Sequence, residues 1–181
     1  MGVAQALTAI VLGLAAPTTA SHSLVSDASA LQAVAAACSG AGSSGGSDHA
    51  QLEAMYCGLN VVRRSYGLTA VRGNAALNRS SSLKAQAVRR CGFSHTPCGM
   101  SFSSTFRRAG YFPARAFSEN LAWGEGDLGS PLRTLGLWLN SPPHRANLLG
   151  RSWRDLGIAV ERGSMFGRGS VSLWVTEFGR R

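Results

Sequence analysis

The sequence predicts an α+β domain in which helices precede a mostly antiparallel sheet. Through the first part of the foldable chain, apolar residues recur at the three- and four-residue spacing of amphipathic helices. Near the C-terminus, two segments instead alternate in the manner of strands and are rich in branched and aromatic residues. This order, helices first and strands last, is typical of α+β domains with helices packed on sheet faces. The length of 181 residues suits one domain.

Capping and helix-breaking residues bound the expected helices. The first runs from Asp48, as a capping residue, to Tyr66 and ends at Gly67. The others are a helix from Asn74 to Cys91, a short one over 101–109, one that starts at Ser130-Pro131 and a short one that starts at Ser141-Pro142-Pro143 and ends at Gly150.

Three strands are expected. They are a strand through Glu119–Trp123, one over Leu156–Val160 and one over Val171–Phe178. The Gly-rich stretch 162–170 between the last two is typical of a hairpin connection. Trp138 and Trp174 lie on apolar faces and are expected in the core.

The N-terminal residues are predicted to be an export signal followed by a flexible segment. Residues 1–20 hold an apolar run from Ala6 to Ala16, too short to span a bilayer, and end in Thr-Thr-Ala, which suits cleavage after Ala20. Residues 21–47 are rich in Ser, Ala and Gly and are expected to bury little. The folded domain is therefore placed at 48–181, in a secreted or envelope-associated protein without a transmembrane helix.

Four cysteines are present, and an even number in an exported chain indicates disulfides. Three pairings are open. Cys57 falls at helical spacing among apolar residues, so it faces inward and can reach the segment that contains Cys38. This favours Cys38–Cys57 together with the local pair Cys91–Cys98.

The formal net charge is +9, and the basic residues are scattered rather than clustered. Lys84 is the only lysine, and no recognisable nucleic-acid-binding module accompanies the charge, so specific nucleic-acid binding is not expected. The charge is compatible with an anionic lipid or an anionic cell-envelope polymer as a partner.

Three side chains that could carry chemistry stand at the ends of expected elements. His95 follows the second helix, Glu119 begins a strand, and His144 lies at the start of the last short helix. Side chains at element ends can converge on one site. His22 and His49 lie in the N-terminal segment and are given no role.

A series of motifs in a characteristic order makes the chain resemble a known family. The motifs are Leu59-Asn60, Arg63 and Gly67-Leu68, then Phe93-Ser94-His95, then Arg107 and Gly110-Tyr111, then Glu119-Asn120-Leu121-Ala122, then Trp138, Ser141, His144-Arg145 and Asn147-Leu148-Leu149, and finally Gly157-Ile158-Ala159-Val160. From about Leu52 to Phe178, the chain resembles the CAP superfamily (cysteine-rich secretory, antigen 5 and pathogenesis-related 1 proteins, also called the SCP domain), of the bacterial secreted type.

The resemblance implies a three-layer α-β-α sandwich with a central cleft. In that family, two histidines and usually two acids line the cleft and can hold a divalent metal. By position, His95 and His144 match the histidines and Glu119, followed by Asn120, matches one acid. The second acid is missing, because no Asp or Glu occurs between His95 and Gly110.

Two imidazoles and one carboxylate form a known ligand set for zinc in an open site, where a bound water can be activated. Asn120 could then orient the carboxylate or the water. Alternatively, the same side chains form a structural hydrogen-bond network. No separate general base is evident, so the catalytic residues are unknown.

Two classes of function remain open at this stage. The favoured one is a secreted binding module without catalysis, which uses the cleft for a small apolar molecule, a lipid, an envelope polymer or a protein. The other is a metal-dependent, peptidase-like hydrolase that uses His95 and His144, with Zn²⁺ or another divalent cation as cofactor.

Overall fold

A four-stranded sheet forms the centre of the protein. The structure is a computed structural model that describes residues 25–181, so the predicted signal peptide and His22 lie outside the described residues. The strands are β1 (Arg72–Gly73), β2 (Ala116–Glu125), β3 (Asp155–Met165) and β4 (Arg168–Arg180), in the spatial order β1-β3-β4-β2. Strands β2, β3 and β4 pair antiparallel, and only the unpredicted β1 is parallel to its neighbour β3.

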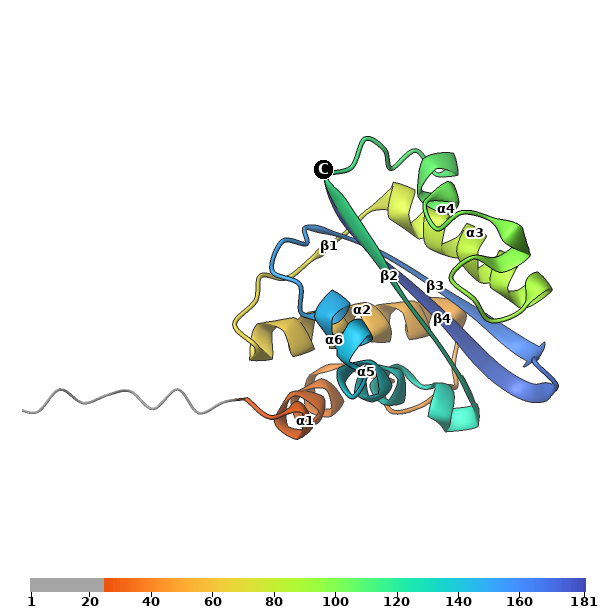
Figure 1. Cartoon of the computed structure of the whole chain (residues 1–181). Helices are drawn as coiled ribbons and strands as arrows, with labels where there is room; N and C mark the ends of the chain where they lie inside the picture. The colour runs from red at the N-terminus through yellow and green to blue at the C-terminus, as the bar shows by residue number, and fades with distance from the viewer. Residues whose placement is uncertain (1–24) are drawn as a thin grey trace, which may run out of the picture.

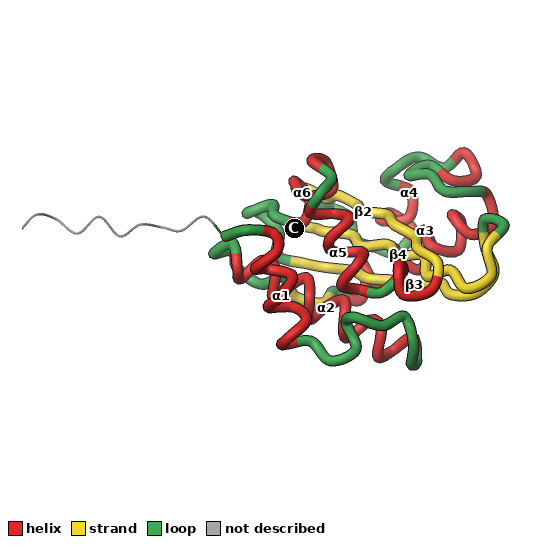
Figure 2. Tube along the Cα trace, turned by 90° about the horizontal axis from the view of Figure 1, so that it is seen from below, coloured by secondary structure: helices red, strands yellow, loops and turns green. Residues whose placement is uncertain are grey.

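Helices cover both faces of this sheet, which confirms the predicted α-β-α sandwich (Figure 1). Helices α3 (Ala75–Cys91) and α4 (Ser104–Arg108) lie on one face, and α2 (Asp48–Ser65), α5 (Pro131–Leu139) and α6 (Pro142–Leu148) on the other. Helix α1 (Asp27–Ala37) lies outside α2 and α5, as Figure 2 shows from below. Two short 3₁₀ helices lie in the connections: η1 (Pro97–Gly99) between α3 and α4, and η2 (Gly126–Gly129) between β2 and α5. Within residues 25–181, no helix is both long and apolar enough to cross a bilayer.

The hydrophobic core has two halves because successive side chains of a strand point to opposite faces. On β4, Leu173 and Val175 join the buried cluster beneath α3, whereas Trp174 and Phe178 join the larger one shared with α2 and α5. Trp174 is fully buried and Trp138 is 1% exposed, so both predicted core tryptophans are confirmed.

Most expected helix limits agree with the structure to within a few residues. Asn74 caps α3 by accepting hydrogen bonds from the amides of Ala76 and Leu77. The first predicted helix begins at Asp48, but its capping side chain is Ser47, which accepts from the amide of Ala50. The helix expected over 101–109 is shorter, spanning only Ser104–Arg108.

The C-terminal hairpin is longer than predicted. The stretch 162–170, expected as its connecting loop, instead extends both strands, and Met165 pairs with Arg168. Phe166 and Gly167 alone form the turn, with φ of 53° and 75°. Two central residues with positive φ match the twist of a two-residue hairpin. A phenylalanine rarely adopts such a backbone conformation, so composition alone suggested a longer loop.

The largest correction concerns residues 21–47, predicted to be flexible. Residues 27–37 form α1, capped by Ser26, and Ala30 and Val34 on its inner face are fully buried. The prediction grouped alanine with serine and glycine, although alanine is the strongest helix former. The ordered fold therefore begins at least twenty residues before Asp48.

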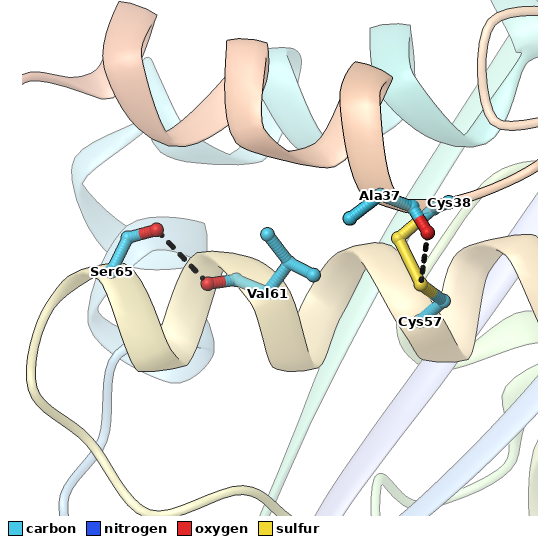
Figure 3. The surroundings of a disulfide bond; sticks show 5 residues. All are labelled: Ala37, Cys38, Cys57, Val61 and Ser65. Atoms are coloured by element: carbon cyan, nitrogen blue, oxygen red, sulfur yellow. Dashed lines mark hydrogen bonds between the residues drawn. A yellow bond between two sulfur atoms is a disulfide. The ribbon is translucent and has the colours of Figure 1, made fainter.

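Both predicted disulfides are present in the structure. Cys38, which follows α1 directly, is bonded to Cys57 on α2, and Cys91 at the end of α3 is bonded to Cys98. Figure 3 shows the first bridge, which ties the two neighbouring helices together. The described residues contain no free cysteine.

Removing the Cys38–Cys57 bridge should destabilise the protein. A Cys38→Ser/Cys57→Ser variant should lose about 3 kcal/mol of unfolding free energy, because the bridge restrains a long loop in the unfolded chain. Urea denaturation under non-reducing conditions measures the loss. The matched Cys91→Ser/Cys98→Ser variant should lose about 2 kcal/mol, since its loop is shorter. Equal unfolding curves for wild type and the first variant would contradict this prediction.

Candidate functional site

The predicted site residues Glu119 and Asn120 lie on β2, an outer strand of the described sheet. They are neighbours in sequence, so their side chains point to opposite faces. Glu119 contacts residues of the α3 layer, whereas Asn120 contacts residues of α6. The Asn120 side chain therefore points away from the Glu119 carboxylate.

On the α3 side, the Glu119 carboxylate has two partners. Its Oε1 lies 2.7 Å from His95 Nδ1, and its Oε2 lies 3.3 Å from Lys84 Nζ. The side chains of Glu119 and Lys84 are fully buried, whereas that of His95 is about half exposed. The Lys84 ammonium also donates a hydrogen bond of 2.6 Å to the backbone carbonyl of His95. Lys84 therefore holds both the carboxylate and the loop that presents the histidine.

A second buried acid, Glu177, lies directly across from Glu119. The two residues are paired in the antiparallel register of β2 and β4, so both side chains face α3. The hydroxyl of Thr105 donates to Glu177 Oε1 at 3.4 Å. Burial raises the pKa of Glu177 to about 8, and the negative charge of Glu119 adds to this shift. We call Lys84, His95, Glu119 and Glu177 the central cluster.

On the opposite face, polar groups fasten α6 to the sheet. The Asn120 amide donates to the backbone carbonyl of His144 at 3.0 Å. Asn147 donates to Asn120 Oδ1 at 2.9 Å and to the Glu119 carbonyl at 3.1 Å. Asn120 therefore positions the backbone of α6 rather than the Glu119 carboxylate.

His144 lies at the N-terminal end of α6, where its Nδ1 is 2.7 Å from the Ser141 hydroxyl. Burial lowers the pKa of His144, and the nearby charge of His95 lowers it further. His95 is therefore close enough to affect the protonation of His144. Among residues 25–181, however, no group of three or more His, Cys, Asp or Glu side chains is placed to hold a metal ion. That His95, His144 and Glu119 together bind a divalent metal ion stays a prediction.

Two buried charged residues of the central cluster, Lys84 and Glu177, were not identified from the sequence. Lys84 was counted only toward net charge, although it lies one helical turn from Ser80 and Val88 on the inner side of α3. Glu177 is the only charged residue between Arg168 and Arg180, the two ends of β4. A lone charge on a face that must be buried is the signal that could have identified both residues.

A cavity of about 720 Å³ lies away from the central cluster. Its wall is shared by α1, α5, η2 and the ends of β2 and β4. The apolar lining is formed by Leu31, Trp123, Leu128, Leu132 and Leu137. Two of these side chains are strongly exposed, Leu128 at 65% and Leu137 at 54%. We call this feature the apolar groove; sequence reasoning did not identify it, because its walls come from segments far apart in the chain.

The order of motifs, the sandwich and the disulfides define a cysteine-bridged α-β-α domain. Residues 58–178 match the model of the CAP family, the cysteine-rich secretory protein family, and the chain belongs to this family. No curated protein matches the chain significantly.

Solved bacterial structures share the fold. An outer surface protein from Borrelia burgdorferi has a TM-score of 0.61 and 19% identity, with 72% of this chain and 92% of that one covered. An extracellular protein containing an SCP domain from Bacillus anthracis has a TM-score of 0.58 and 16% identity, with 76% and 45% covered. A cysteine-rich secretory protein from Staphylococcus aureus has a TM-score of 0.54 and 19% identity, with 74% and 39% covered. This chain thus spans less than half of the last two.

Proposed function

We propose that this protein is a secreted, non-catalytic binding module for a small amphiphile that has one apolar chain and an acidic head group. The apolar groove is the observation that carries the proposal. Its volume of about 720 Å³ is that of a typical small-molecule site. Exposed leucines that converge on a groove, rather than being scattered, are typical of interaction sites. The proposed ligand site therefore differs from the central cleft predicted from sequence.

Charged residues at the rim support an acidic head group. Arg133 and Arg168 both border the apolar groove, together with one acid, Glu125. Arg168 pairs with Glu125 at 3.5 Å, whereas no ion pair among the described residues involves Arg133. Arg133 is therefore available to a carboxylate or phosphate beside the apolar wall.

Export fits this role. Two disulfides are typical of proteins that mature in an oxidising environment. Two of the bacterial proteins with this fold are named as extracellular or outer surface proteins. We propose that the chain is likewise secreted or held at the cell envelope, where lipids and acyl-bearing polymers are its neighbours.

Filling the groove should abolish ligand binding. Gly136 lies in the groove wall on α5, and a side chain added there would first meet Leu31. Gly136→Leu should weaken binding of a fluorescent sixteen-carbon fatty acid by about tenfold or more, equivalent to about 1.4 kcal/mol. Fluorescence titration measures the affinity. Arg90→Leu adds the same side chain to an exposed position of α3 and should bind like wild type.

The head group is tested by a second comparison. Arg133→Gln should weaken binding of the fatty acid while leaving binding of the matching fatty alcohol unchanged, because only the acid carries a charge. The proposal fails if wild type binds neither compound saturably, or if Gly136→Leu binds both as well as wild type does.

The metal-dependent hydrolase has no comparable support. A hydrolase of that kind needs a metal-activated water beside a general base. In the central cluster, Glu119 is already engaged by His95 and Lys84. No observation on the described residues favours hydrolysis over binding.

A further inference from the structure

We propose that the Lys84 ammonium is a built-in cation of the central cluster, standing where a divalent ion would have to bind, and that the wild-type protein therefore binds no zinc through Glu119. The inference is independent of the proposed amphiphile, because the central cluster and the apolar groove share no residue. It also departs from the ligand set that the family resemblance implies.

Three contacts fix the position of the ammonium. Lys84 Nζ lies 3.3 Å from Glu119 Oε2 and donates to the His95 carbonyl at 2.6 Å. It also lies 5.4 Å from the centre of the Phe102 ring, within the range of a cation–π interaction. The side chain is fully buried, so the ammonium has no solvent into which to withdraw.

A zinc ion would meet this charge at close range. Zinc bound to a carboxylate oxygen and an imidazole nitrogen lies about 2 Å from each of them. An ion so placed on Glu119 would be only a few ångströms from Lys84 Nζ, and two cations repel strongly at that distance in a partly buried site. The other oxygen, Oε1, is already engaged by His95 Nδ1 at 2.7 Å. His95 therefore engages one carboxylate oxygen, whereas the other, which lacks a hydrogen bond among the described residues, has the Lys84 ammonium as its ion-pair partner.

The charges of the central cluster also balance without a metal. Glu119 and Glu177 face each other across β2 and β4, and Lys84 supplies the single buried positive charge beside them. One lysine neutralises one carboxylate, and the second acid can remain protonated. If Lys84 loses its charge, Glu119 is left buried beside His95 without a compensating cation, and a carboxylate next to an imidazole attracts a divalent cation.

Removing the lysine charge should therefore create a zinc site. Isothermal titration of Zn²⁺ at neutral pH should show no binding to wild type that is lost in a Glu119→Gln variant. Lys84→Met, of similar length but uncharged, should bind one Zn²⁺ roughly a hundredfold or more tighter than wild type. Adding His95→Ala to Lys84→Met should remove the gained binding. Gln86→Met, on an exposed position of the same helix, should behave like wild type.

A variant that folds poorly still gives a result. Zinc that binds only the folded state should raise the Tm of Lys84→Met and leave that of wild type unchanged. Lys84→Gln keeps a donor for the His95 carbonyl and should gain zinc binding in the same way. The proposal is overturned if wild type binds zinc in a manner abolished by Glu119→Gln. It is also overturned if neither lysine variant binds zinc or is stabilised by it.

Discussion

Replacing Glu177 by glutamine should make the protein more resistant to alkaline pH. Glu177 is fully buried, and its pKa is raised from 4.5 to about 8. The groups that face it are Glu119 on β2, Lys84 on α3 and Thr105 on α4. At neutral pH the folded protein holds Glu177 protonated, whereas the unfolded chain releases the proton.

The sign of the effect follows from proton binding. Between pH 4.5 and about 8, the folded state holds one more proton at this residue than the unfolded state does. Stability therefore falls as pH rises, by about 1.4 kcal/mol per pH unit at most, and by roughly 4 kcal/mol between pH 5 and 8. Glutamine resembles the protonated acid but does not titrate, so Glu177→Gln should lack this loss.

Urea denaturation at several pH values tests the prediction. The difference in unfolding free energy between Glu177→Gln and wild type should grow with pH and level off above about pH 8. Titration of His144 and other groups is common to both proteins and cancels in this difference. Glu53→Gln changes an exposed acid and should show no such trend. Parallel curves for Glu177→Gln and wild type would rule out a buried, protonated Glu177.

Replacing Arg63 should be among the most destabilising single changes. Its guanidinium is fully buried and donates to backbone carbonyls from separate segments: Thr69, Leu148 and Gly150. Leu148 is the last residue of α6, where a positive charge also favours the helix dipole. Arg63 thus holds the end of α2 against the end of α6.

Arg63→Met keeps much of the apolar stem but leaves these carbonyls without donors. Each buried carbonyl that loses its partner costs about 1–3 kcal/mol, so we expect a loss of roughly 4 kcal/mol of unfolding free energy. Chemical denaturation measures the loss, and Arg64→Met is the matched control, because Arg64 is exposed. A loss below that of an ordinary surface substitution, about 0.5 kcal/mol, would show that these hydrogen bonds contribute little.

Local signals in the sequence were sufficient for much of the fold. The cap at Asn74, the proline starts of α5 and α6 and the alternation around Trp174 each act within a few residues. Helix α1 was missed because its stability depends on Val34 burying against the core and on a bridge to α2, which are tertiary effects. The turn at Phe166 was missed because its backbone is unusual for that residue.

The candidate site was only partly predictable for a similar reason. The motif order identified His95 and Glu119, which the structure brings into contact. It gave no indication of Glu177, because the register between β2 and β4, rather than nearness in sequence, sets the two acids opposite each other. The apolar groove forms where α1, α5 and η2 pack together. Local sequence patterns do not predict how such distant segments pack.

The burial of Lys84 has a practical consequence for chemical labelling. Apart from the α-amino group, Lys84 carries the only aliphatic amine in the chain, and in the folded protein its side chain is fully inaccessible to solvent. An amine-directed dye or cross-linker should therefore modify the folded protein at its N-terminus alone. Because acylation of Lys84 requires opening of the domain, its rate would report unfolding from within the sandwich, without any engineered probe.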